Sequence, residues 1–126
     1  MGFWISLEQD GEVVSVSSHT EGGIIQIGGS TDADMSITYN YSGLWPLALG
    51  PKPEGSYKEL YGLGAWLQGK TAAETLPLLR AGCAKLVGEP DPDYWKACPG
   101  NARRTLETLI RWGEQHPEAV WNVHSG

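Results

Sequence analysis

The chain has 126 residues, the length of one domain with its own hydrophobic core, so we expect residues 1–126 to form a single domain. Hydrophobic residues make up 40% of it and charged residues 19%, which excludes a wholly disordered chain. A formal net charge of −6 argues against general nucleic-acid binding, because that activity needs Lys and Arg to neutralise phosphates.

Residues 1–42 carry the patterns of a β-rich segment. Asp10-Gly11 separates two alternating apolar runs, and Asp-Gly at such a position predicts a hairpin with a two-residue turn. The short apolar run 24–27 lies between glycine pairs and fits either a strand or an ordered loop. Residues 34–41 alternate again, which predicts a strand with Asn40 on the face opposite the apolar residues. That apolar face holds Met35, Ile37, Tyr39 and Tyr41.

The rest of the chain has mainly helical patterns. Proline and glycine interrupt residues 43–69, which predicts loops and a short helix within 56–69. Thr71 and Glu74 have the spacing of a capping box and open an apolar stripe, which predicts a helix over 71–87. A second stripe predicts a helix over 101–116, with Asn101 as its N-cap.

Residues 119–124 return to alternation and predict a final strand. This strand must join a sheet whose other strands come from the first third of the chain. We therefore expect an α+β fold: an antiparallel β-sheet made of the N-terminal hairpin, strand 34–41 and strand 119–124, with two main helices on one face.

Cysteine usage and hydropathy indicate the compartment. Cys83 and Cys98 lack the C-x-x-C spacing, and no secretory leader precedes them, so we expect reduced, structural thiols. No apolar stretch reaches the ~18 residues needed to span a bilayer. We expect a cytoplasmic protein without membrane contact.

Catalytic motifs are scarce. The chain has no G-x-S-x-G, H-E-x-x-H, Walker loop or G-x-G-x-x-G motif. His19, His116 and His124 do not have the spacing of metal ligands. Lys70-Thr71 opens a helix and could present N–H groups to an anion, although helix capping explains the same residues. We expect no enzymatic activity, metal or cofactor.

A binding surface is easier to build from these residues. Six Trp and five Tyr are many for this length, and we expect two or three Trp near the surface. Tyr94-Trp95 precedes the cations Lys96, Arg103 and Arg104 and the expected helix start at Asn101. Cations at a helix N-terminus favour an anion, and an aromatic face suits a base ring. The alternative is a capped helix with solvated arginines.

Three segments, ITYNYS (37–42), GKTAAETLPLL (69–79) and residues 94–123, resemble a family of small proteins encoded by bacteriophages and their bacterial hosts. That family shows a Tyr-Thr-Tyr-Asn-like strand, a Gly-Lys-Thr-Ala helix start and a Pro-x-Asn loop. The matching polar positions here are Tyr39, Asn40, Lys70, Thr71 and Asn101. The chain departs from the family at Gln68, where an acidic residue is usual, and at 102–104, where Gly-Trp-Gly is usual.

The resemblance implies a phage context rather than a particular activity. Many small accessory proteins of phages block host immunity, and by this analogy three hypotheses follow. In the first, a homo-oligomer of the protein sequesters a small nucleotide signal. In the second, its acidic surface binds a basic groove of a host defence protein, as an anti-CRISPR-like inhibitor would. In the third, it is a virion or assembly component. The candidate ligand-binding residues are Tyr39, Asn40, Lys70, Thr71, Trp95, Lys96, Asn101, Arg103 and Arg104.

Overall fold

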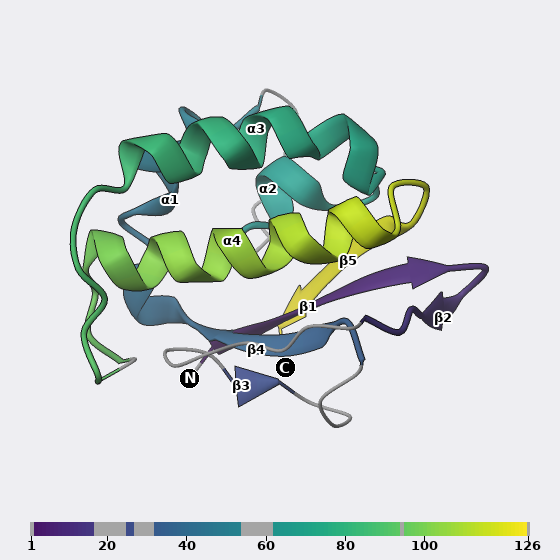
Figure 1. Ribbon diagram of the computed structural model, residues 1–126, viewed down its shortest axis with the longest axis horizontal. Helices are drawn as coiled ribbons and strands as arrows, with labels where there is room; N and C mark the ends of the chain where they lie inside the picture. Colours follow the sequence, from purple (N-terminus) through teal and green to yellow (C-terminus); the bar gives the residue numbers. More distant parts are fainter. Residues whose placement is uncertain (1, 17–24, 27–31, 54–61, 94, 126) are drawn as a thin grey trace.

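The computed structural model describes residues 2–16, 25–26, 32–53, 62–93 and 95–125. Its elements follow the order β1, β2, β3, β4, η1, α1, α2, α3, α4, β5, where η1 is a 3-10 turn. Every strand pair in this described part is antiparallel, and the helices lie on one side of the sheet (Figure 1). The expected α+β class, with two main helices on one face of an antiparallel sheet, is confirmed.

The central strand of the sheet is β1, which pairs with three others. The strands are β1 (Gly2–Gln9), β2 (Glu12–Val13), β3 (Ile25–Gln26), β4 (Asp34–Thr38) and β5 (Val120–Ser125). Ile5 of β1 lies opposite Met35 on β4 and opposite Val123 on β5. Since β3 pairs with β4, residues 25 and 26 of the short apolar run form a strand, whereas residues 24 and 27 lie outside the described residues.

The expected hairpin forms at Asp10 and Gly11. Their φ angles of 55° and 80° are both positive, as a type I′ turn requires. Beyond the turn, Val14 N–H donates to Leu7 O, and Leu7 N–H donates to Ala33 O. Because the N–H and C=O of one strand residue point to the same edge, β2 and β4 follow one another along one edge of β1. The opposite edge belongs to β5.

One face of the sheet forms the core beneath the helices. The side chains buried on this face are Phe3, Ile5, Leu7, Met35, Ile37, Trp121 and Val123. Four of the six Trp residues are at most 2% exposed, whereas Trp95 is 45% exposed and Trp4 is half-buried. The prediction of two or three Trp near the surface is confirmed.

The predicted strand 34–41 is too long. β4 ends at Thr38, and Tyr39–Tyr41 forms the 3-10 turn η1. The cause is local: Thr38 Oγ1 accepts a hydrogen bond from Asn40 N–H at 3.1 Å, and this side-chain bond competes with the strand ladder. Tyr41 is nevertheless buried as expected, with its ring 6.0 Å from that of Trp45. Asn40 is exposed.

In the described residues, four α-helices cover the core: α1 (Trp45–Leu49), α2 (Gly64–Leu67), α3 (Ala72–Lys85) and α4 (Pro99–Gln115). The capping box of Thr71 and Glu74 is present at the start of α3, which ends two residues before the predicted boundary. The sequence predicted a short helix within 56–69, and the structure has α2 in this segment. Residues 56–61, like His19 and Tyr94, lie outside the described residues. In the described part, no helix has the length and apolar character needed to cross a membrane.

Trp121 gives a test of how polar atoms are satisfied in the core. Its indole Nε1 donates to Thr75 Oγ1 at 2.8 Å, and both residues are at most 2% exposed. Replacing Thr75 by Val keeps nearly the same shape but leaves a buried donor unpaired. We expect the free energy of unfolding in urea to fall by about 1–3 kcal/mol. In the double variant with Trp121→Phe the losses should be less than additive, because both partners are then gone. Equal stability of Thr75→Val and wild type would contradict this.

Candidate functional site

The Lys70-Thr71 segment serves the fold. Gly69 N–H donates to Trp121 O, and Trp121 N–H donates to Lys70 O, so this segment covers the outer edge of β5. Thr71 N–H and Glu74 N–H are used by the capping box, and Ala72 N–H donates to Ala119 O. The amides that a phosphate would need are therefore occupied by the protein itself. Only the exposed Lys70 side chain could meet a ligand here.

Asn101 is not the N-cap of the last helix, which corrects the prediction. α4 begins two residues earlier, at Pro99, and its N-cap is Cys98. Proline fits the first helical position because its φ is already helical and the absent N–H would be unpaired there. Asn101 is thus drawn into the first turn of α4, where its side chain is fully buried.

The buried amide of Asn101 fixes the preceding loop instead. Its Oδ1 accepts from Asp91 N–H at 2.8 Å, and its Nδ2 donates to Asp93 O at 3.1 Å and to Lys96 O at 3.0 Å. Gly100 lets the loop approach the helix, since a Cβ there would lie 2.3 Å from the carbonyl carbon and oxygen of Glu89. We call residues 88–98 the Trp95 loop.

Asn40 fixes the other side of the Trp95 loop. Its Nδ2 donates to Trp95 O at 2.7 Å, which joins the turn after β4 to a residue 55 positions later. Tyr39, next to it, is half-buried with its ring 6.0 Å from Phe3. The structure therefore brings the predicted residues Tyr39, Asn40, Trp95, Lys96 and Asn101 into one region.

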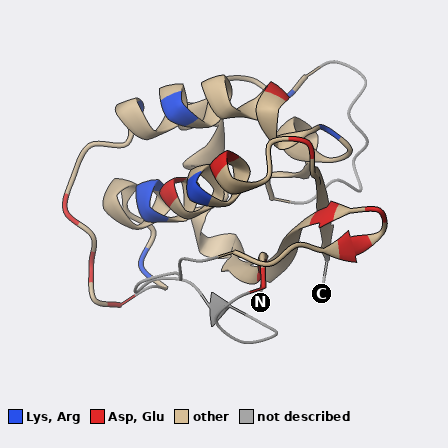
Figure 2. Ribbon diagram, turned by 45° about the vertical axis from the view of Figure 1, so that its right-hand side comes forward, with Lys and Arg blue, Asp and Glu red and all other residues tan. Residues whose placement is uncertain are grey.

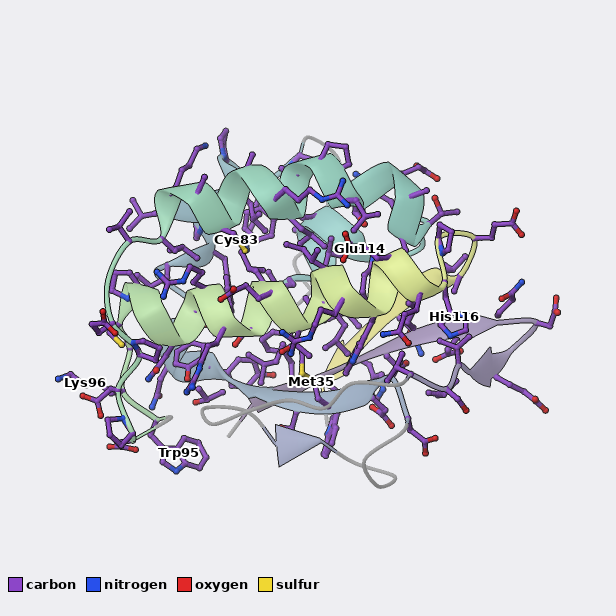
Figure 3. All side chains as sticks on the ribbon, viewed as in Figure 1. Met35, Cys83, Trp95, Lys96, Glu114 and His116 are labelled. Carbon is purple, nitrogen blue, oxygen red and sulfur yellow. The ribbon has the colours of Figure 1, made fainter. Side chains whose placement is uncertain are left out.

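The side chains at the tip of this loop face solvent. Trp95 is 45% exposed, and Figure 3 shows Trp95 and Lys96 at the outer edge of the molecule. Lys96 Nζ lies 3.3 Å from Asp91 Oδ2, and the Lys96 side chain is 61% exposed. The backbone hydrogen bond from Asp93 and the bond from Lys96 hold the pKa of Asp91 below its usual value. The loop thus exposes an aromatic face and, one residue later, a paired cation.

Lys70 and Thr71 lie far from this region. Gly113, near the end of α4, packs against Ala72 at the start of α3, so the Lys70-Thr71 segment adjoins the C-terminal end of α4. The Trp95 loop adjoins its N-terminal end, and a helix of 17 residues is about 25 Å long. The predicted set of site residues is therefore divided between two ends of the molecule.

The two neighbouring arginines also separate. Arg103 Nη1 donates to Leu86 O at 3.0 Å, and its Nε lies 3.5 Å from Glu107 Oε1, so it joins α4 to the end of α3. Arg104 points along a different side of α4, where it lines a cavity of about 170 Å³. Arg104, Glu107, Thr108 and Arg111 line this cavity, which we call the α4 cavity. The prediction did not include Arg111 or Thr108, although their i, i+4 and i+7 spacing from Arg104 was a usable signal.

The described residues offer little for catalysis. No group of three or more His, Cys, Asp or Glu among them could hold a metal ion. Both thiols are free of disulfides. Burial, with a smaller effect of the Glu107 charge, raises the pKa of Cys83 to about 11, which disfavours the thiolate that a nucleophile needs. His116 Nε2 is hydrogen-bonded to Ser15 O at 2.5 Å and so helps to hold the chain after β2.

No protein-family model, curated protein or solved structure matches this chain. Its candidate site is therefore defined by geometry: an exposed Trp on a braced loop at the N-terminal end of α4, and a cavity with two Arg side chains on the same helix. An aromatic face and a set of cations are suited to binding an anion that carries a ring.

The brace on the Trp95 loop can be tested by removing the Asn101 amide. Asn101→Ala loses three hydrogen bonds and leaves buried backbone groups unpaired, so we expect the free energy of unfolding to fall by about 1–3 kcal/mol or more. Amide hydrogen exchange of residues 91–96 should also accelerate. The matched control is Asn40→Ala, which removes one exposed bond to the same loop and should cost less. Equal protection of the loop in Asn101→Ala and wild type would refute the brace.

Proposed function

We propose that the protein is a non-enzymatic binding protein that sequesters a small nucleotide-like ligand, with the base stacked on Trp95. The observation that carries this proposal is the 45% exposure of Trp95 in a chain that buries four other Trp side chains. Exposed aromatic surface on a tightly held loop favours a contact role, because burying it on binding gives free energy that the free protein has not used.

The bracing of the loop supports the same role. Asn40 and Asn101 hold its backbone from two directions. A loop already fixed in one conformation loses less entropy when a ligand binds, so more of the contact energy appears as affinity. Lys96, the next residue in the loop, carries an exposed cation that is paired with Asp91 at 3.3 Å. Together they suit a ligand with a base and an anionic group.

The biological role that we propose follows from the resemblance to phage-encoded proteins. A nucleotide signal can be removed from a host defence pathway by binding alone, without chemistry. Such a protein works by stoichiometry, which fits a small chain that acts as a homo-oligomer in the host cytoplasm.

Thermal denaturation with a ligand panel tests the proposal. A cyclic nucleotide or ADP-ribose at about 100 times its Kd should stabilise the folded protein by ~2.7 kcal/mol and raise Tm. Trp95→Ala should abolish the increase, whereas Trp95→Phe, which keeps an aromatic face, should retain most of it. The absence of any Tm increase across the panel, or an equal increase in Trp95→Ala, would count against nucleotide binding.

An acidic surface supports a second candidate, the inhibitor of a basic host protein. Glu8 follows the buried Leu7 and Asp34 precedes the buried Met35, so strand alternation places both on the face of the sheet opposite the helices, and Asp32 is close in the chain. Figure 2 shows Asp and Glu positions, in red, along the hairpin between β1 and β2. Burial raises the pKa of Asp34, the charges of Asp32 and Glu8 raise it further, and His124 lowers it. The charges of these carboxylates therefore repel one another, and a positively charged partner would relieve this repulsion.

Native mass spectrometry of protein purified from the cells that naturally produce it separates the two candidates. We expect a retained mass of a few hundred daltons, in the range of a nucleotide. A stoichiometric protein partner, lost when Glu8, Glu12, Asp32 and Asp34 are reversed in charge, would favour the inhibitor instead.

A further inference from the structure

The α4 cavity has a volume of about 170 Å³. Its four lining residues have the spacing i, i+3, i+4 and i+7 and so form one stripe of the helix. All four side chains are polar. A pocket of this size is smaller than the roughly 300–1,000 Å³ that encloses a whole small molecule, but much larger than the ~10–15 Å³ that one water needs. It suits one or two phosphate groups.

The balance of charge in the cavity is positive. Glu107 lies 3.5 Å from Arg103 Nε, so an arginine outside the cavity offsets its carboxylate. Arg104 has no ion pair or side-chain hydrogen bond within the described part of the chain, and Arg111 brings a second guanidinium. This local excess of positive charge stands out in a chain whose formal net charge is −6.

Thr108 positions one of the two guanidinium groups. It is only 2% exposed, and its Oγ1 donates to Arg104 O at 3.0 Å and accepts from Arg111 Nη2 at 3.3 Å. A guanidinium has N–H donors in a planar fork, and this bond orients that of Arg111. An oriented guanidinium fits the bidentate geometry that phosphate oxygens accept.

We propose that Arg104 and Arg111 bind the phosphate groups of the ligand, with Arg111 oriented by Thr108. This deepens the proposed function and rests on it for the ligand class. Arg104 lies one helical turn after Asn101, about 4.5 Å along the axis, and Asn101 holds the Trp95 loop. Arg104 and Arg111 are about 10.5 Å apart along α4, which favours a diphosphate over a single phosphate.

Isothermal titration of the full chain with inorganic pyrophosphate tests this site without any base. We expect saturable binding to wild type that weakens with salt, and a loss of about tenfold or more in both Arg104→Gln and Arg111→Gln. The matched control is Arg80→Gln. Arg80 is a more exposed arginine on α3, paired with Glu114 at 2.9 Å outside the cavity, and its loss should leave the affinity unchanged.

Several results would overturn the proposal. One is the absence of saturable pyrophosphate binding to wild type, and another is equal affinity in the cavity variants and the control. A third is tighter binding of a dicarboxylate of equal charge, because the cavity would then be a site for an acidic side chain. Amide chemical shifts of wild type decide the matter even if a variant fails to fold. Pyrophosphate must shift the resonances of Thr108 and Arg111, and shifts confined to other residues would refute the site.

The same measurements separate this site from the proposed function. Nucleotide binding that needs Trp95 but neither arginine would refute the phosphate site and leave the proposed function intact. Pyrophosphate binding that needs both arginines, without tighter binding of any nucleotide, would support the phosphate site and refute the proposed function.

Discussion

The alternation of apolar side chains along β1 is the constraint on which the rest of the structure depends. Phe3, Ile5 and Leu7 are fully buried on one face, so the strand needs a helix layer above it. Both of its edges also need partners, because buried backbone N–H and C=O groups must be hydrogen-bonded. β5 fills one edge, and β4 followed by β2 fills the other. The first and last segments of the chain are thereby joined in one sheet.

Side-chain amides and hydroxyls complete this backbone where regular elements end. Gln68 Oε1 accepts from Val123 N–H at 2.6 Å at the outer edge of β5, and Thr38 ends β4. Asn101 does the same for the Trp95 loop. Each bond fixes a loop relative to the core without apolar contact. This is how a domain of this size can hold a long, polar loop in one conformation and still leave Trp95 exposed.

The two parts of the candidate site differ in how they are built. The Trp95 loop is shaped by distant residues, because Asn40 and Asn101 come from different elements. The α4 cavity is formed by residues of one helix, in which Thr108 orients Arg111, three positions later, through a hydrogen bond. In the proposed complex, the ring of the ligand would stack on the Trp95 loop and its phosphate groups would lie in the α4 cavity. Helix α4 would then connect the two contacts. Neither part requires a thiolate or a metal, which is consistent with binding as the function that we propose.

The sequence by itself determined the features that depend on near neighbours. The Asp10-Gly11 turn, the capping box of Thr71 and the amphipathic stripes follow from residues within about four positions of one another, so local hydrogen bonds and periodicity are enough to predict them. The α+β class followed from the same patterns.

Only the tertiary structure decided the roles of the polar residues. Asn101 looked like an N-cap, yet Pro99 starts the helix earlier and turns the Asn101 amide toward a loop. Arg103 and Arg104 look equivalent in sequence, but a helix places neighbours about 100° apart, so one meets Leu86 and the other lines a cavity. Which polar atom a side chain reaches depends on where distant backbone lies, and that is set by the packing of the whole fold.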